Sequence, residues 1–106
     1  MKLLSRSEEI ILLTVLKLKD EAYGVSIREQ IFKDTGHTWS FASIYQPLNK
    51  LVRKHYVSKI AGEPTPERGG KRKYYYRITP QGKKALRIIL DTHKRVWNDI
   101  SQMALE

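Results

Sequence analysis

The sequence predicts an α+β fold that is mostly helical, with three short helices, a two-stranded hairpin and a longer C-terminal helix. Apolar residues recur at helical spacing in four segments, 10–18, 25–32, 44–52 and 86–104. Residues 56–60 and 73–78 instead alternate in the way that half-buried strands do. Gly69-Gly70, with two prolines just before, predicts the turn between these strands.

The first helix is predicted by Ser5-Arg6-Ser7-Glu8, a capping box in which Ser5 accepts an early amide and Glu8 reaches back. The residues that follow are nearly all apolar, from Ile10 to Leu18. A helix with so small a polar face should be covered on more than one side. In a chain this small, we expect a second subunit to supply part of that cover.

Residues typical of helix boundaries mark the limits of the second and third helices. Tyr23-Gly24 marks the break before the second helix, and Gly36 is expected to end it. Ser40 is the candidate cap of the third helix. Pro47 lacks an amide donor and clashes with the preceding turn, so the sequence predicts either a kink there or a later start, near Ser43.

The third helix has one face of amides and cations. Its polar residues are Ser43, Gln46, Asn49, Lys50 and Arg53, and the sequence holds no acid between Ser40 and Lys59. Asn and Gln can pair with adenine edges, and Arg and Lys with guanine or phosphate. An ordinary solvent-facing helix would mix in Asp or Glu. The pattern therefore favours a helix that enters the major groove of DNA.

The positive charge of the chain is concentrated around the hairpin. Residues 50–84 hold eleven Lys/Arg and two Glu, whereas the rest of the chain holds nine of each sign, so this third carries the whole net charge of +9. In the second strand, Tyr74, Tyr76 and Ile78 should share one face, with Lys73, Tyr75 and Arg77 on the other. A concentrated basic patch is typical of a polyanion binder, with a merely solvated surface as the alternative.

The C-terminal helix is predicted to begin at Thr79 as cap, with Pro80 in its first position. Its apolar stripe is spaced like a heptad repeat over almost three repeats: Leu86, Leu90, His93, Trp97, Ile100 and Ala104. Such a stripe on a terminal helix predicts a dimer interface, formed together with the first helix.

The sequence predicts no metal site, no phosphate-binding loop and no catalytic serine. There is no cysteine, and His37, His55 and His93 are far apart, so no metal site is expected. Arg72 stands where a phosphate-binding loop needs Ser or Thr, and no serine has a paired base. Polar residues interrupt the apolar N-terminus, which predicts neither a signal peptide nor a membrane span. The sequence thus predicts a protein that is not an enzyme and needs no cofactor.

These motifs together resemble the PadR family of winged helix-turn-helix transcriptional regulators, over about residues 4–90. The resemblance rests on Tyr23-Gly24, on the segment Ser43 to Leu51 that contains Tyr45, Pro47 and Leu48, and on a basic, tyrosine-rich hairpin that ends in Thr79 and Gly82. Many relatives have one residue fewer between the glycines and the threonine, which predicts a bulge or a longer tip here. The single C-terminal helix resembles the short subfamily.

The resemblance implies a winged helix-turn-helix DNA-binding domain in residues 1–79 and a dimerisation helix in 80–106. It implies a cytoplasmic prokaryotic repressor, nucleoid-associated when DNA-bound, that binds a pseudo-palindromic operator as a homodimer. In this family the tyrosine of the third helix, here Tyr45, lies near the DNA backbone. Some short members bind flat aromatic compounds between interface tryptophans, which suggests His93 and Trp97 as ligand contacts, although Trp97 could equally be interface core.

The candidate residues fall into two sets. The DNA-binding candidates are Ser40, Ser43, Tyr45, Gln46, Asn49, Lys50, Arg53, Lys54, Lys71, Arg72 and Lys73. The dimer-interface candidates are Ile11, Val15, Leu86, Leu90, His93, Trp97, Ile100 and Ala104. Two other classes stay open: a small basic RNA-binding protein and a winged-helix protein-interaction module.

Overall fold

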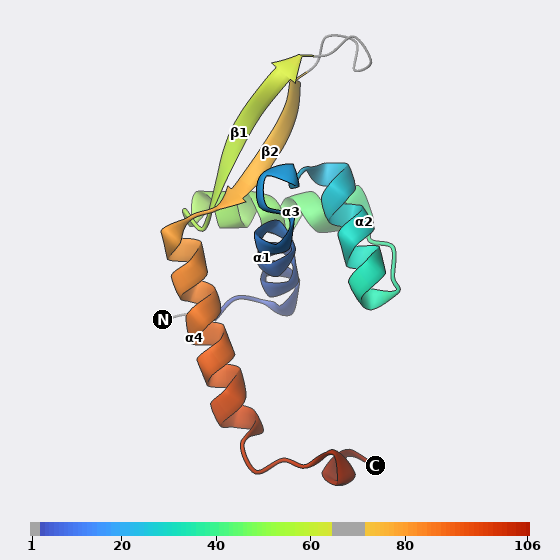
Figure 1. The fold of residues 1–106 in the computed structure, drawn as a ribbon, viewed down its shortest axis with the longest axis vertical. Coiled ribbons are helices and arrows are strands. Elements are labelled where there is room, and N and C mark those ends of the chain that lie inside the picture. Colours follow the sequence, from blue (N-terminus) through green and yellow to red (C-terminus); the bar gives the residue numbers. More distant parts are fainter. Residues whose placement is uncertain (1–2, 65–71) are drawn as a thin grey trace.

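The computed structural model describes residues 3–64 and 72–106, and it has the predicted order of elements (Figure 1). The helices are α1 (Arg6–Leu18), α2 (Gly24–Thr35), α3 (Phe41–Arg53) and α4 (Pro80–Trp97), and the antiparallel strands are β1 (Val57–Pro64) and β2 (Arg72–Ile78). Single turns of 3-10 helix follow α1, at Lys19–Glu21, and close the chain, at Gln102–Leu105. The α+β, mostly helical winged fold is therefore confirmed.

The helix caps form as the sequence predicts. The Ser5 hydroxyl accepts from the Glu8 amide at 3.2 Å, and the Glu8 carboxylate accepts from the Ser5 amide at 3.0 Å. Gly36 ends α2 in the left-handed region, with φ 77°. Ser40 caps α3 and Thr79 caps α4. These interactions lie within a few residues along the chain, which is why the sequence alone locates them.

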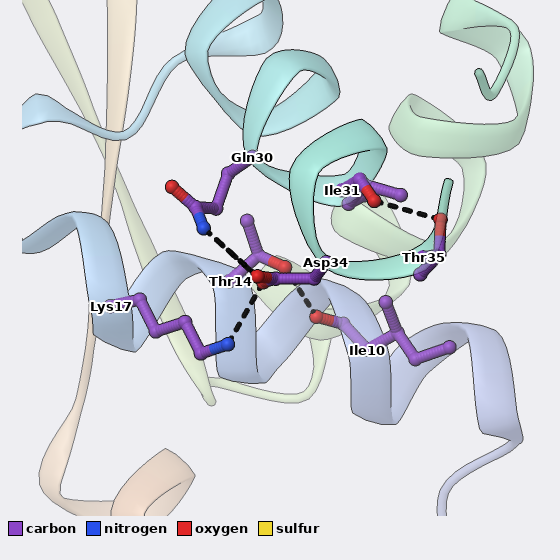
Figure 2. Close-up of polar contacts among 7 residues, drawn as sticks. All are labelled: Ile10, Thr14, Lys17, Gln30, Ile31, Asp34 and Thr35. Carbon is purple, nitrogen blue, oxygen red and sulfur yellow. Dashed lines mark hydrogen bonds and ion pairs between the residues drawn. The ribbon is translucent and has the colours of Figure 1, made fainter. Parts of the chain in front are cut away.

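Helices α1, α2 and α3 pack around one apolar core. The base of the hairpin and the first turns of α4 complete this core. Its members are Ile11, Leu12, Val15, Ala22, Ile27, Ile31, Ile44, Leu48, Leu51, Val57, Tyr76 and Leu86. On the surface, α1 and α2 are joined through Asp34, whose carboxylate accepts from Lys17 at 2.8 Å and from Gln30 at 3.2 Å (Figure 2).

The hairpin β1–β2 projects from the helices as a wing (Figure 1). The Tyr76 amide donates to the Ala22 carbonyl at 2.8 Å, and the Tyr75 ring packs edge-on against Tyr23, so the wing is attached to the start of α2. The pairing shifts register between Ala61 and Pro64. The extra residue of this irregularity lies in β1, whereas the sequence placed the additional residue between Gly69-Gly70 and Thr79, so the predicted bulge or longer tip stays a prediction.

The N-terminus of α4 is fixed against the end of α3. The Thr79 hydroxyl donates to the His55 carbonyl at 2.6 Å. A Cβ on Gly82 would come within 2.3 Å of the Tyr56 carbonyl oxygen, so only glycine fits in this crossing. The C-terminal part of α4 extends beyond the other helices (Figure 1), although Ile89 still packs against the core.

Two predictions about the helices need correction. The helix expected over residues 80–106 ends at Trp97, so Ile100 and Ala104 do not continue its stripe. Asn98 is extended and Asp99 is left-handed, with φ 68°. Both residue types are poor helix formers, and this end of the chain has little packing to hold a helix. In α3, the later start near Ser43 is excluded as one of the two alternatives raised by Pro47: the helix begins at Phe41, directly after its predicted cap Ser40, and runs through Pro47.

Candidate nucleic-acid interface

Helix α3 separates its core residues from its polar residues. Ile44, Leu48 and Leu51 are fully buried. The predicted DNA-binding residues Ser43, Gln46, Asn49, Lys50 and Arg53 are all exposed along the opposite side. Ser40 is also exposed, but its hydroxyl caps the helix, accepting from the Ser43 amide at 3.1 Å. Apart from this cap, the side-chain amides and the cations of α3 are exposed and can contact a partner.

Tyr45 lies against the start of α2. A Cβ on Gly24 would come within 2.1 Å of the Tyr45 hydroxyl, so the tyrosine occupies the space that a side chain there would take. The Tyr45 ring also stacks on Phe41, and the Arg28 guanidinium covers Phe41 at 4.7 Å from the ring centroid. The Tyr-Gly motif at the start of α2 thus positions a side chain of α3.

The wing carries lysines that are held on aromatic rings. The Lys73 ammonium lies 3.6 Å from the centroid of Tyr23, and the Lys59 ammonium lies 4.4 Å from that of Tyr74. Arg72 is exposed, while Arg77 pairs with Asp20 at 2.8 Å. Lys71, the other predicted contact of the wing, lies outside the described residues. Cation–π contacts fix the lysines in place without neutralising their charge.

Lys54 has a different environment from the other candidates. Its ammonium pairs with Glu8 at 2.8 Å, which ties the end of α3 to the start of α1. Burial raises the pKa of Glu8, but hydrogen bonds from Lys54 and from Ser5 outweigh this, and the net pKa is lowered. The structure therefore assigns Lys54 a role in holding α3 rather than a free charge.

This ion pair predicts a loss of stability in acid. Because the pKa of Glu8 is lowered on folding, its contribution is present above the ordinary carboxyl pKa and is lost as the pH falls through the folded value. Glu8→Gln keeps an acceptor for Ser5 and should cost about 1 kcal/mol at pH 7, since Lys54 is partly exposed. The measurement is urea unfolding of both proteins at pH 7 and pH 3. A difference that is equal at the two pH values would contradict this role.

Helices α1 and α4 share a surface with a large apolar part, bordered by Glu9, Lys83, Arg87 and His93. A groove of about 580 Å³ lies between the two helices, lined by Leu13, Leu16, Leu86 and Leu90 among others. Leu13, Leu16 and Leu90 are 37%, 38% and 49% exposed. Farther along α4, the rings of His93 and Trp97 lie 5.7 Å apart and both are exposed.

The candidate interface residues of α1 need correction. Ile11 and Val15 are 0% and 1% exposed, in the core that α1 shares with the other helices, and have no surface to offer a partner. Leu13 and Leu16, on the next face of the same helix, are the exposed ones. An apolar run without a polar face does not reveal which side meets the core.

The sequence analysis missed several residues that lie near the candidate DNA contacts. Tyr23, Lys59 and Tyr74 approach the candidate residues only through packing of the wing on α2 and α3. The alternation of β1 was the available signal, since it places Lys59 on the same face as Val57, which packs in the core.

Among the described residues, no His, Cys, Asp and Glu side chains form a metal-binding group. No helix in the same part of the chain is long and apolar enough to cross a membrane.

Comparison with known proteins agrees with this geometry. The model of the transcriptional regulator PadR-like family matches residues 12–88. A transcriptional regulator from Clostridium thermocellum is 26% identical, with a TM-score of 0.70 and 90% of each chain covered. A PadR family transcription regulator from Clostridium difficile, at 23% identity and TM-score 0.67 over 93% of this chain and 98% of that one, has the same fold. No curated protein sequence matches the chain.

Proposed function

Because the chain belongs to the PadR-like family of DNA-binding transcriptional regulators, which are not enzymes, we propose that it is a sequence-specific repressor that binds a pseudo-palindromic operator as a homodimer. The observation that carries this proposal is the exposed face of α3. It presents Gln46 and Asn49 for base edges, next to Lys50 and Arg53 for guanine or phosphate.

The wing extends the same basic surface beyond α3. Arg72 is exposed and Lys73 is held above Tyr23, so both are available to phosphates on either side of the groove that α3 enters. Lys71 belongs to this set by sequence. In this division of roles, the wing supplies affinity for any duplex and α3 supplies preference for one sequence.

The homodimer is proposed from the apolar groove between α1 and α4. Leu13, Leu16 and Leu90 leave apolar surface exposed around one groove, and a second copy related by a two-fold axis would cover them. Two α3 helices would then reach successive major grooves about 34–36 Å apart. The two-fold symmetry of such a dimer explains why the operator should be pseudo-palindromic.

The function is tested by selecting bound sites from random duplexes. We expect an inverted repeat, and Asn49→Ala should weaken binding to the selected site by about 1–3 kcal/mol while leaving binding to random DNA nearly unchanged. Fluorescence anisotropy with both duplexes and with an RNA hairpin gives the three affinities. Recovery of no common sequence, or tighter binding to the RNA, would reject the proposal.

We also propose that a planar aromatic compound regulates DNA binding through Trp97. The indole is 46% exposed and lies beside His93 on the projecting part of α4, where a two-fold axis would bring two such pairs close together. Planar aromatic cations should quench the fluorescence of Trp97 in a saturable way. Trp97→Phe, which retains Trp39, should lose this quenching; equal quenching in both proteins would leave Trp97 a packing residue.

A further inference from the structure

A pocket lies between α3 and the wing, on the side proposed to face DNA. It measures about 250 Å³, room for several waters, and is lined by residues of α2, α3 and both strands. Tyr45 and Asn49 come from α3, whereas Lys59, Tyr74 and Tyr76 come from the hairpin. Tyr23, Gly24, Val25, Arg72 and Lys73 complete the lining, which contains no acid.

The polar groups of this pocket can all donate hydrogen bonds. Tyr76 is only 3% exposed, yet its hydroxyl has no hydrogen-bond partner among residues 3–64 and 72–106. No polar side-chain atom in the described part of the chain is both fully buried and unpaired, so this hydroxyl is open to the pocket that it lines. Burial, and then the nearby Tyr45 and Tyr74, raise the pKa of Tyr76, which keeps its proton available for donation at neutral pH.

The charge of the pocket is positive and fixed in position. The register places Lys59 opposite Tyr76, and its ammonium rests 4.4 Å from the centroid of Tyr74. Lys73 is held over Tyr23 on the other wall. Because cation–π contacts already order both lysines, less side-chain entropy is lost when an anion binds between them.

We propose that this pocket binds one phosphoryl group, through the ammonium groups of Lys59 and Lys73, the hydroxyls of Tyr45 and Tyr76, and the amide of Asn49. A group with several acceptor oxygens matches a pocket whose donors come from three elements, and an anion matches a lining that has several cations and no acid. The phosphoryl group can come from a backbone phosphate of the bound duplex or from a small phosphorylated compound. The first source rests on the proposed function, and the second does not.

The first arm of the test uses inorganic phosphate without DNA. Phosphate is titrated against chloride at equal ionic strength and followed by amide chemical shifts. Saturable shifts are expected at Lys59, Tyr74 and the Asn49 side chain, and should be lost in Tyr76→Phe. Tyr75→Phe is the matched control, because it removes a hydroxyl from the neighbouring tyrosine, which does not line the pocket.

The second arm uses the duplex recovered by site selection. Lys59→Met should lower the slope of affinity against salt by about 1 per subunit, and Tyr76→Phe should weaken binding about tenfold. Neither change is expected in Lys84→Met or Tyr75→Phe. A neutral methylphosphonate at one backbone position should abolish the effect of Lys59→Met, which identifies the phosphate concerned.

The outcomes separate the two sources. A response in the duplex arm alone assigns the pocket to the DNA backbone, and a response to inorganic phosphate alone assigns it to a small phosphorylated ligand. If the pocket variants match their controls in both arms, the proposal is overturned, while specific duplex binding by the unmodified protein would leave the proposed function intact. If the unmodified protein binds no duplex, the proposed function fails and the inorganic phosphate arm decides the pocket.

Discussion

Leu90→Asp is expected to convert the protein to a monomer and to weaken operator binding by about 10²–10⁴-fold. Leu90 is 49% exposed and borders the groove that also holds Leu13 and Leu16. In a dimer that covers this groove, a carboxylate would lose its hydration among apolar side chains, a cost that pairing with Arg87 or His93, which also line the groove, would offset only in part. A monomer loses the gain from linking two half-sites, which accounts for the size of the effect.

Light scattering after size exclusion, together with anisotropy on the selected duplex, measures both results. Gln81→Asp is the control, since it introduces the same charge at an exposed position of the first turn of α4. If the heptad stripe of α4 continued to Ile100, Ile100→Asp would disrupt the dimer as strongly as Leu90→Asp. Because Ile100 lies beyond the end of α4, its substitution should have a smaller effect. A Leu90→Asp protein that stays dimeric and binds normally would remove this groove from the interface.

Replacing Lys71, Arg72 and Lys73 together by Met is expected to weaken binding to every duplex by about 10²–10³-fold at moderate salt. Each cation that meets a phosphate releases counterions, so the loss of six such contacts from a dimer should lower the salt slope by up to about 5. Methionine keeps an apolar stem against Tyr23, which limits the effect on folding.

The matched control removes three cations from elsewhere on the surface: Lys19, Lys33 and Lys94. It has the same net charge as the wing variant but should keep most of the slope. Asn49→Ala provides the opposite pattern, with loss on the selected site only. If the wing variant and the control gave equal slopes of affinity against salt, the positive charge of the whole protein would attract DNA without defined contacts from the wing.

The sequence by itself determined the order of elements, their caps and the polar face of α3. These features depend on short-range rules: the capping boxes join residues three positions apart, and Gly36 and Thr79 each act on the adjoining helix end. The alternation in residues 73–78 likewise depends on neighbouring positions. Family membership followed from such local motifs, because their order along the chain is itself specific.

Tertiary structure alone decided which of these residues meet. Glu8 reaches Lys54 across 46 positions, Tyr45 fills the space at Gly24, and Tyr76 joins Lys59 and Tyr45 around one pocket. It also placed Ile11 and Val15 in the core and ended α4 at Trp97. Periodicity states that a face is apolar, but the packing of distant segments determines what covers that face and where a helix loses its support.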